Sequence, residues 1–210
     1  MPIIRTSTKL IYFSHIPKCG GASVEAYLHA VSGGKLAFLD NNYRMVNESV
    51  RWCKSPPQHI DGAALSKLFP AAFFDAFFAV TRNPVARFES AFHFQKYVES
   101  TIGLEISIND FIKSLDYQKI THSGYYDNHF MPQYMFLYPD IPYTFFKLEE
   151  GLENVKAYID TLFFGNERSQ RMPHVNAKRS VKSTPHEPLS PLSEEKLRTL
   201  YSHDYELFGY

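Results

Sequence analysis

The chain has 210 residues, a length that suits one domain and leaves little room for two. Hydrophobic residues make up 44% of it and charged residues 21%, which excludes an intrinsically disordered chain. Lys and Arg (22) balance Asp and Glu (22), so the zero net charge excludes a globally basic nucleic-acid binder. We therefore expect one domain over residues 1–210 and no nucleic-acid partner.

Cysteine content and apolar runs bear on the compartment. Cys19 and Cys53, the only cysteines, are too few for a disulfide framework or for a zinc site by themselves. The apolar run at 10–13 is too short for a signal peptide or a membrane span, and no later run approaches about 18 residues. The sequence therefore predicts a soluble protein of a reducing compartment, with no transmembrane segment.

The predicted elements alternate between strands and helices. Pro84 suits the first turn of a helix, and Val85, Phe88 and Phe92 give that helix one apolar face. The order is typical of an α/β fold, and we expect a single-domain, P-loop-like parallel sheet flanked by helices. The predicted strands are 10–16, 73–81 and 143–147, and the predicted helices are 22–28, 62–69, a helix from Pro84, 107–115, 152–162 and a final helix from Ser193.

A glycine pair separates the first strand from the first helix. Glycines let backbone N–H groups turn toward an anion, and the start of the helix adds a favourable dipole. The lysine precedes the glycines, whereas it follows them in a Walker loop. The segment predicts an anion-binding loop, with an ordinary tight turn as the alternative; no base is evident that would make its cysteine a nucleophile. The segment reads His15, Ile16, Pro17, Lys18, Cys19, Gly20, Gly21, Ala22, Ser23.

A second candidate loop follows the predicted central strand. Arg82 comes at the end of that strand, and Ser90 lies two turns into the next helix. Ligands of open α/β sheets bind beyond the carboxyl ends of the strands, and an arginine grips a phosphate with a bidentate fork. Arg82 and Ser90 are therefore predicted to bind one phosphate. The alternative for Arg82 is an ordinary ion pair at a helix end.

Together the two loops resemble the sulfotransferases. Residues 17–23 look like the 5′-phosphosulfate loop, and residues 82–92 look like the 3′-phosphate segment, usually written R-[DN]-P-x-x-R-x-x-S-x-[FY]. The resemblance is to the subgroup that contains the carbohydrate sulfotransferases acting on chondroitin, dermatan and heparan sulfate, with their short bacterial relatives. It spans residues 10–210. Further matching segments are 127–133, 146–149, 173–176 and 192–210.

Two departures from the family pattern are visible. Ala22 stands where many members carry a hydroxyl or another small polar residue. Animal members carry an N-terminal membrane anchor and extra cysteines, and this chain shows neither. We therefore expect a bacterial cytoplasmic enzyme.

The resemblance implies sulfuryl transfer from 3′-phosphoadenosine 5′-phosphosulfate (PAPS) to an acceptor hydroxyl, on a carbohydrate, by in-line displacement. Residues 17–23 would hold the 5′ end of the donor, and Arg82 and Ser90 its 3′-phosphate. Lys18 would stabilise the leaving oxygen. We expect no metal, because the loops already supply positive charge.

Several residues are candidates for the base that removes the proton of the acceptor hydroxyl. His59 lies between the two phosphate loops, where this subgroup places its catalytic histidine just before a helix. A neutral imidazole titrates in the right range for this role. His129 is the alternative histidine, and a carboxylate such as Asp127 or Glu25 remains open.

A basic segment near the C-terminus adds candidates. Residues 168–182 hold five Lys or Arg residues and no acid. The segment is either a solvated loop or a lid that contacts donor phosphates or an anionic acceptor, with Arg168 and Lys178 counted as donor-binding. Arg171 and Arg179 would be further contacts of such a lid, whereas His174 and Asn176 match the family segment without an assigned role. Lys147, at the end of a predicted strand, is expected to face the pocket.

Two other functions remain open on the sequence. A kinase-like P-loop phosphotransferase shares the strand, glycine loop and helix, but the position of Lys18 argues against it. A non-catalytic nucleotide-binding or glycan-binding protein would keep the same fold.

Overall fold

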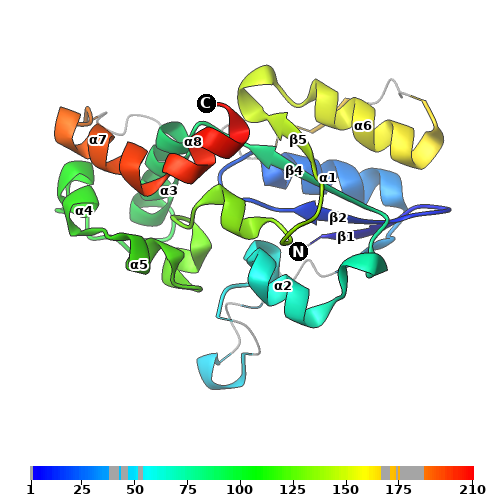
Figure 1. The fold of residues 1–210 in the computed structure, drawn as a ribbon, viewed down its shortest axis with the longest axis horizontal. Coiled ribbons are helices and arrows are strands. Elements are labelled where there is room, and N and C mark those ends of the chain that lie inside the picture. The colour runs from blue at the N-terminus through cyan, green and yellow to red at the C-terminus, as the bar shows by residue number, and fades with distance from the viewer. Residues whose placement is uncertain are drawn as a thin grey trace.

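A computed structural model describes residues 2–37, 43, 47–51, 54–166, 171–173, 175 and 187–210 (Figure 1). Its strands are β1 (Ile3–Arg5), β2 (Leu10–Ser14), β3 (Leu36–Ala37), β4 (Ala76–Thr81) and β5 (Thr144–Lys147). Its α-helices are α1 (Gly21–Ser32), α2 (Gly62–Leu68), α3 (Pro84–Tyr97), α4 (Ile108–Ser114), α5 (Tyr117–Thr121), α6 (Glu153–Phe164), α7 (Pro191–Leu200) and α8 (Ser202–Phe208).

The five strands form one sheet in the order β3-β1-β2-β4-β5. The predicted α/β class is confirmed, and β2, β4 and β5 are parallel as expected. β1 runs antiparallel to both β2 and β3, so the sheet is mixed rather than wholly parallel. Only residues 6–9 join β1 to β2, and a connection this short permits only an antiparallel pair. Neither β1 nor β3 was predicted, because strands of two or three residues carry no periodic pattern.

Three hydrophobic clusters surround the sheet. The first includes Phe13 and Phe78 of the sheet and joins it to α1 and α6. The second includes Phe88 and joins α3, α4 and α7, which Figure 1 shows together on the side of the molecule away from α6. The third includes Phe77 and packs α2 against the sheet. The molecule is thus one α/β domain whose carboxyl strand ends face the second cluster.

Local signals explain where several helices begin. Asn83 caps α3 by accepting hydrogen bonds from two backbone N–H groups, and Pro84 occupies the first turn as predicted. Ser107 caps α4 by accepting a hydrogen bond from the backbone N–H of Asp110. The last predicted helix begins at Pro191 rather than Ser193, because the cap is Ser190, and a separate helix, α8, follows it.

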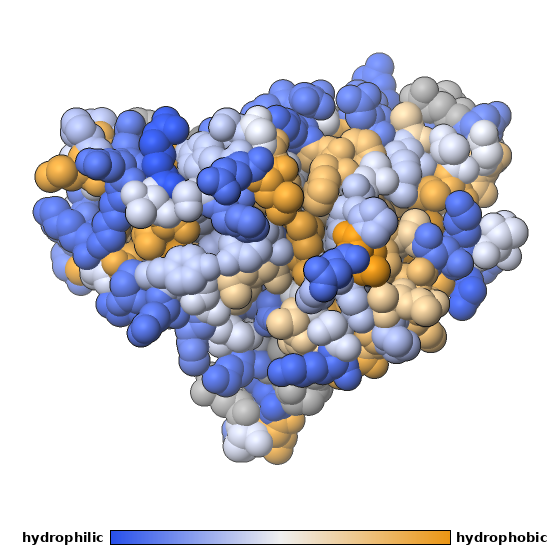
Figure 2. Space-filling model, in the orientation of Figure 1, coloured by the Kyte–Doolittle hydropathy of each residue, from blue (hydrophilic) through white to orange (hydrophobic). Residues whose placement is uncertain are grey.

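The surface in Figure 2 mixes hydrophilic and hydrophobic residues, with hydrophobic colours more frequent near β5 than over α4, α5 and α7. Phe145 of β5 is one of the exposed aromatic residues. None of the helices in the described ranges combines the length and the apolar character needed to cross a bilayer.

The C-terminal helix α8 is tied to the middle of the chain by a buried carboxylate. Asp204 accepts hydrogen bonds from the backbone N–H groups of Gln133 (2.8 Å) and Tyr134 (2.9 Å). Its side chain is fully buried, so water cannot replace either bond. Asp204 therefore fixes the position of Gln133, a residue of the site described below.

We predict that Asp204→Ala lowers the free energy of unfolding by about 3 kcal/mol, because two buried N–H groups lose their acceptor. Asp204→Asn should lose less, since its single carbonyl oxygen still accepts. Urea denaturation measures both changes. Glu206→Ala, on an exposed position of the same helix, is the control and should stay within about 0.5 kcal/mol of wild type. Equal stability of the Asp204→Ala and Glu206→Ala variants would contradict the prediction.

Candidate active site

The loop between β2 and α1 has left-handed backbone at two of its residues, Lys18 (φ 69°) and Gly20 (φ 79°). Glycine adopts this conformation at little cost, whereas a lysine there is strained. Gly20 is the residue at which α1 is capped, so the loop ends on the N-terminus of a twelve-residue helix. The strand, tight loop and helix predicted from the glycine pair are therefore present.

Gly21 is needed for space rather than for backbone conformation. A Cβ atom on it would lie 2.4 Å from Nε2 of His15. The His15 ring is held in that place by Glu25, whose Oε1 lies 2.5 Å from Nδ1. Burial lowers the pKa of His15, and the nearby Glu25 only partly offsets this. The predicted donor loop is thus packed directly against a histidine.

Lys18 and Arg82 place two cations at this loop. The Arg82 guanidinium donates to the backbone oxygen of Lys18 (3.2 Å), and Lys18 Nζ lies 4.0 Å from the centroid of the Phe94 ring. Burial, followed by the charge of Arg82, lowers the pKa of Lys18 to about 8. Within the described part of the chain neither cation forms an ion pair. An arriving anion would relieve this repulsion between like charges.

Cys19 is structural. Its side chain is fully buried, and burial raises the pKa of the thiol to about 12. The thiol donates to the side-chain oxygen of Gln133 (3.4 Å). A neutral, buried thiol is a poor nucleophile, so the structure gives no support to covalent chemistry at Cys19.

Gln133 joins the two predicted phosphate loops. Its Oε1 accepts from the backbone N–H of Arg82 (2.9 Å), and its Nε2 donates to the backbone oxygen of Arg82 (2.8 Å). The same Oε1 accepts from Cys19. Gln133 lies in the segment 127–133 that matches the family, but the sequence suggests no role for it, because its partners are mostly backbone groups.

The other predicted donor-binding residues lie on the same elements. Ser90 is half-buried on α3, and its hydroxyl has no hydrogen-bond partner among the described residues. Ser23 Oγ accepts from the backbone N–H of Val175 (3.0 Å), which brings Val175 to the first turn of α1. Pro17 is buried beneath the loop and Ala22 is half-buried beside it. Five candidates lie outside the described residues: Arg168, His174, Asn176, Lys178 and Arg179.

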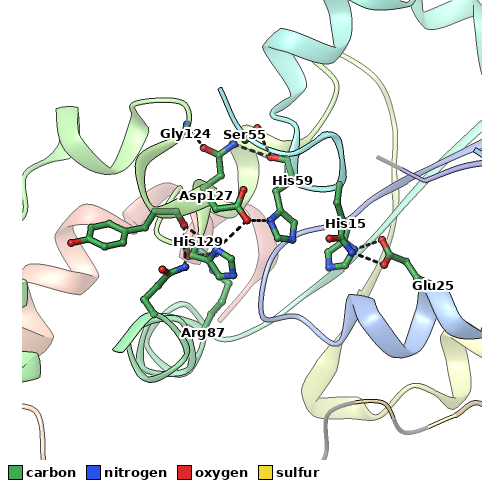
Figure 3. Close-up of polar contacts among 12 residues, drawn as sticks. His15, Glu25, Ser55, His59, Arg87, Gly124, Asp127 and His129 are labelled. Atoms are coloured by element: carbon green, nitrogen blue, oxygen red, sulfur yellow. Dashed lines mark hydrogen bonds and ion pairs between the residues drawn. The ribbon is translucent and has the colours of Figure 1, made fainter. Parts of the chain in front are cut away.

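Three histidines lie in a row, as Figure 3 shows, with His59 between His15 and His129. The His59 ring centroid is 5.2 Å from that of His15 and 5.1 Å from that of His129. Asp127 Oδ2 lies 2.9 Å from Nδ1 of His59. A carboxylate accepts the proton of Nδ1, so a neutral His59 keeps the lone pair of Nε2 free. This is the arrangement that orients a general base.

His129 has a different partner. Its Nδ1 donates to the backbone oxygen of Tyr126 (2.9 Å), and its ring stacks on Phe94 at 5.2 Å. Burial, then the charges of His59 and Lys18, lowers its pKa well below the ordinary value. Phe94 contacts both Lys18 and His129, so one aromatic side chain links the donor loop to the histidines.

A strained turn carries Asp127. Tyr126, Asp127 and Asn128 are consecutive non-glycine residues with left-handed backbone, a conformation that costs each of them roughly 1 kcal/mol or more. The Asn128 side chain, fully buried, donates to the backbone oxygen of His59 (2.8 Å) and accepts from the N–H of Gly124 (2.7 Å). These bonds hold the turn against the segment that contains His59.

Arg87 and Lys147 have structural partners. Arg87, fully buried on α3, donates to the backbone oxygens of His129 and Met131, and so fixes the chain that follows the strained turn. The sequence pattern contained this arginine, but its spacing alone suggested no role. Lys147 Nζ donates to the backbone oxygen of Gly209 (2.7 Å) and lies over the ring of Tyr210. Lys147 therefore binds the C-terminal residues.

His59, Asp127 and His129 also present ligand atoms within 4.8 Å of one another, a set that could hold a metal ion. Lys18 and Arg87 both act by charge to lower the pKa of His129. The same positive potential opposes a divalent cation at this place. The hydrogen-bonded pair of His59 and Asp127 is therefore the feature on which we base the function.

We predict that Gly21→Ala displaces the His15 ring, because the new Cβ would overlap Nε2. The free energy of unfolding should fall by about 2 kcal/mol, and the NMR signals of the His15 ring should shift. Ala22→Ser, at the next position, is the control and should change neither. A Gly21→Ala protein with wild-type stability and unchanged His15 signals would show that the ring is not held in this place.

Comparisons with known proteins bear on the whole chain. A family model described as the Sulfotransferase family matches residues 1–210. Comparison with curated proteins and with solved structures gave no significant match. The match supports a transferase with sulfotransfer activity in general. With the mixed α/β sheet and the loop that precedes α1, it shows that the chain belongs to the sulfotransferase family.

Proposed function

We propose that the protein transfers a sulfuryl group from PAPS to a hydroxyl of a carbohydrate acceptor, with His59 as the base. The observation that carries the proposal is the orientation of His59 by Asp127, next to a loop with two cations that form no ion pair with any described residue. The carbohydrate acceptor, and a bacterial cytoplasmic setting, rest on the resemblance to the short bacterial members of the subgroup.

The donor would lie along the carboxyl ends of β2 and β4. Residues 17–23 supply the N-terminus of α1 and the Lys18 ammonium for the 5′-phosphosulfate. Arg82 and the hydroxyl of Ser90 supply charge and a donor for the 3′-phosphate. The pKa of Lys18 is lowered by burial and by the charge of Arg82. A bound anion would raise this pKa again, because it favours the protonated form of the amine.

PAPS supplies the activated sulfuryl group: its sulfur forms a bond to the acceptor oxygen while the bond to the bridging oxygen breaks. Nε2 of His59 takes the hydroxyl proton, and the Asp127 carboxylate stabilises the imidazolium that results. Lys18 faces the negative charge that develops on the leaving phosphate oxygen. The residues of this chain thus act by positioning and by electrostatics.

We predict that Arg82→Ala weakens binding of 3′-phosphoadenosine 5′-phosphate by roughly 10- to 100-fold, because a charged fork to the 3′-phosphate is lost. Affinity for adenosine 5′-phosphate, which lacks that phosphate, should change little. Calorimetry measures both, and Arg5→Ala, on an exposed position of β1, is the matched control. Equal losses for the two nucleotides would reject the assignment, and tighter binding of ATP with magnesium would favour the phosphotransferase.

We predict that His59→Ala lowers kcat by at least about 100-fold while donor affinity stays within about twofold. The acidic limb of the pH–rate profile should disappear with it. Asp127→Asn should lower kcat by at least about tenfold, because the amide no longer stabilises an imidazolium. Steady-state assays with an acceptor panel measure these changes. If His129→Ala is inactive and His59→Ala keeps its turnover, His129 is the base.

A further inference from the structure

Glu25 is a buried carboxylate on α1 that the proposed chemistry does not use. The residue is 8% exposed, and each of its two carboxylate oxygens has a different partner. Oε1 lies 2.5 Å from Nδ1 of His15, and Oε2 accepts from Nε2 of Gln58 (2.6 Å). Two segments 43 residues apart in the sequence are therefore joined through one carboxylate.

The two partners of Glu25 belong to the two halves of the candidate site. His15 leads into the donor loop, and its ring packs on Gly21. Gln58 is the neighbour of His59 in the short turn Pro57–His59. Figure 3 shows His15 lying between Glu25 and His59. The carboxylate thus connects the donor loop with the segment that carries the base.

The charge of Glu25 suits this double role. Burial raises its pKa, but the charge and hydrogen bond of His15 and the hydrogen bond of Gln58 outweigh burial, so the pKa is lowered. An ionised carboxylate accepts hydrogen bonds at both oxygens, and bonds to a charged acceptor are about twice as strong as neutral ones. Glu25 can therefore hold both partners at once.

The turn that contains His59 also forms hydrogen bonds with a segment other than the donor loop. Asp127 binds the His59 ring and Asn128 binds the His59 backbone, and both come from the strained turn at 126–128. These ties fix the base relative to that turn. They do not fix it relative to the donor loop, which belongs to β2 and α1. Gln58 and Glu25 supply a hydrogen-bonded connection to the donor loop, in addition to the contact between the His59 and His15 rings.

We propose that Glu25 is a positioning residue, which sets the distance between the donor loop and the base through His15 and Gln58. The inference rests on the proposed function, because it needs a base at His59 and a donor at residues 17–23. Glu25 touches no reacting atom. Its effect is on alignment, and a displacement of about 1 Å at a reacting group costs about 100-fold in rate.

The deciding variant is Gln58→Leu, because Gln58 is half-buried and its loss leaves the His15–Glu25 pair and the donor loop in place. We expect kcat to fall by at least about tenfold, with affinity for 3′-phosphoadenosine 5′-phosphate within about twofold of wild type. Gln118→Leu makes the same chemical change on the exposed face of α5 and should be silent. Denaturation curves would show that both variants are folded.

A second pair of variants separates alignment from charge. Glu25→Ala removes the bridge and should lower kcat by at least about tenfold. Glu25→Gln can still accept from His15 and donate to the Gln58 oxygen, so it should recover most of that loss. If Glu25→Gln is as slow as Glu25→Ala, kcat depends on the charge of the carboxylate and not on its hydrogen bonds to His15 and Gln58. The proposal is then wrong.

The same assay includes His59→Ala, so that two failures can be told apart. If His59→Ala is inactive while Gln58→Leu keeps wild-type kcat, the assignment of His59 as the base is supported and the positioning role of Glu25 is rejected. If His59→Ala retains its kcat, the proposed base is rejected, and the inference about Glu25 is rejected with it. A Gln58→Leu protein that loses donor affinity in proportion to kcat would also overturn the proposal.

Discussion

One buried amide, that of Gln133, sets the geometry on which the candidate site depends. The two predicted anion-binding loops follow adjacent parallel strands, β2 and β4, so the sheet alone places the two strands about 4.8 Å apart where the loops begin. Beyond the last ladder bond the sheet no longer constrains them. Beyond that point Gln133 holds the two loops together, because it forms hydrogen bonds with the backbone N–H and oxygen of Arg82 and accepts one from the thiol of Cys19. Since the amide is fully buried, water does not compete for these bonds.

Adjacent histidines differ here because their partners differ. The Asp127 carboxylate lies 2.9 Å from Nδ1 of His59, where it stabilises a positive ring, but 3.9 Å from Nδ1 of His129. His129 donates instead to a backbone carbonyl and lies near the buried charge of Arg87. The first environment suits a group that gains a proton during the reaction, and the second keeps its ring neutral. The strained backbone at 126–128 makes this possible, because it presents Asp127 to His59 while the carbonyl of Tyr126 accepts from His129.

The parts of this arrangement that carry local signals could be predicted from the sequence. Gly20 and Gly21 marked the first loop, Pro84 marked the start of α3, and the histidines at 59 and 129 were both named as bases. The partners of those residues could not be predicted in the same way. Asp127 was considered only as an alternative base, and Gln133 and Arg87 bind mainly backbone atoms, whose positions follow from the whole fold. Arg168 and Lys178 remain predictions, because they lie outside the described residues.

The candidate site lies where the three hydrophobic clusters meet. Cys19 of the predicted donor loop belongs to the first cluster, Ile60 beside the proposed base to the third, and Phe130 after the strained turn to the second. Each cluster can hold its own segment, but apolar packing is non-directional and does not fix one segment relative to another. The directional contacts between clusters are polar: Gln133, Glu25 and Asp127 each join segments from different ones. Apolar side chains therefore supply most of the stability of the fold, whereas the alignment of the site segments depends on polar side chains such as these three.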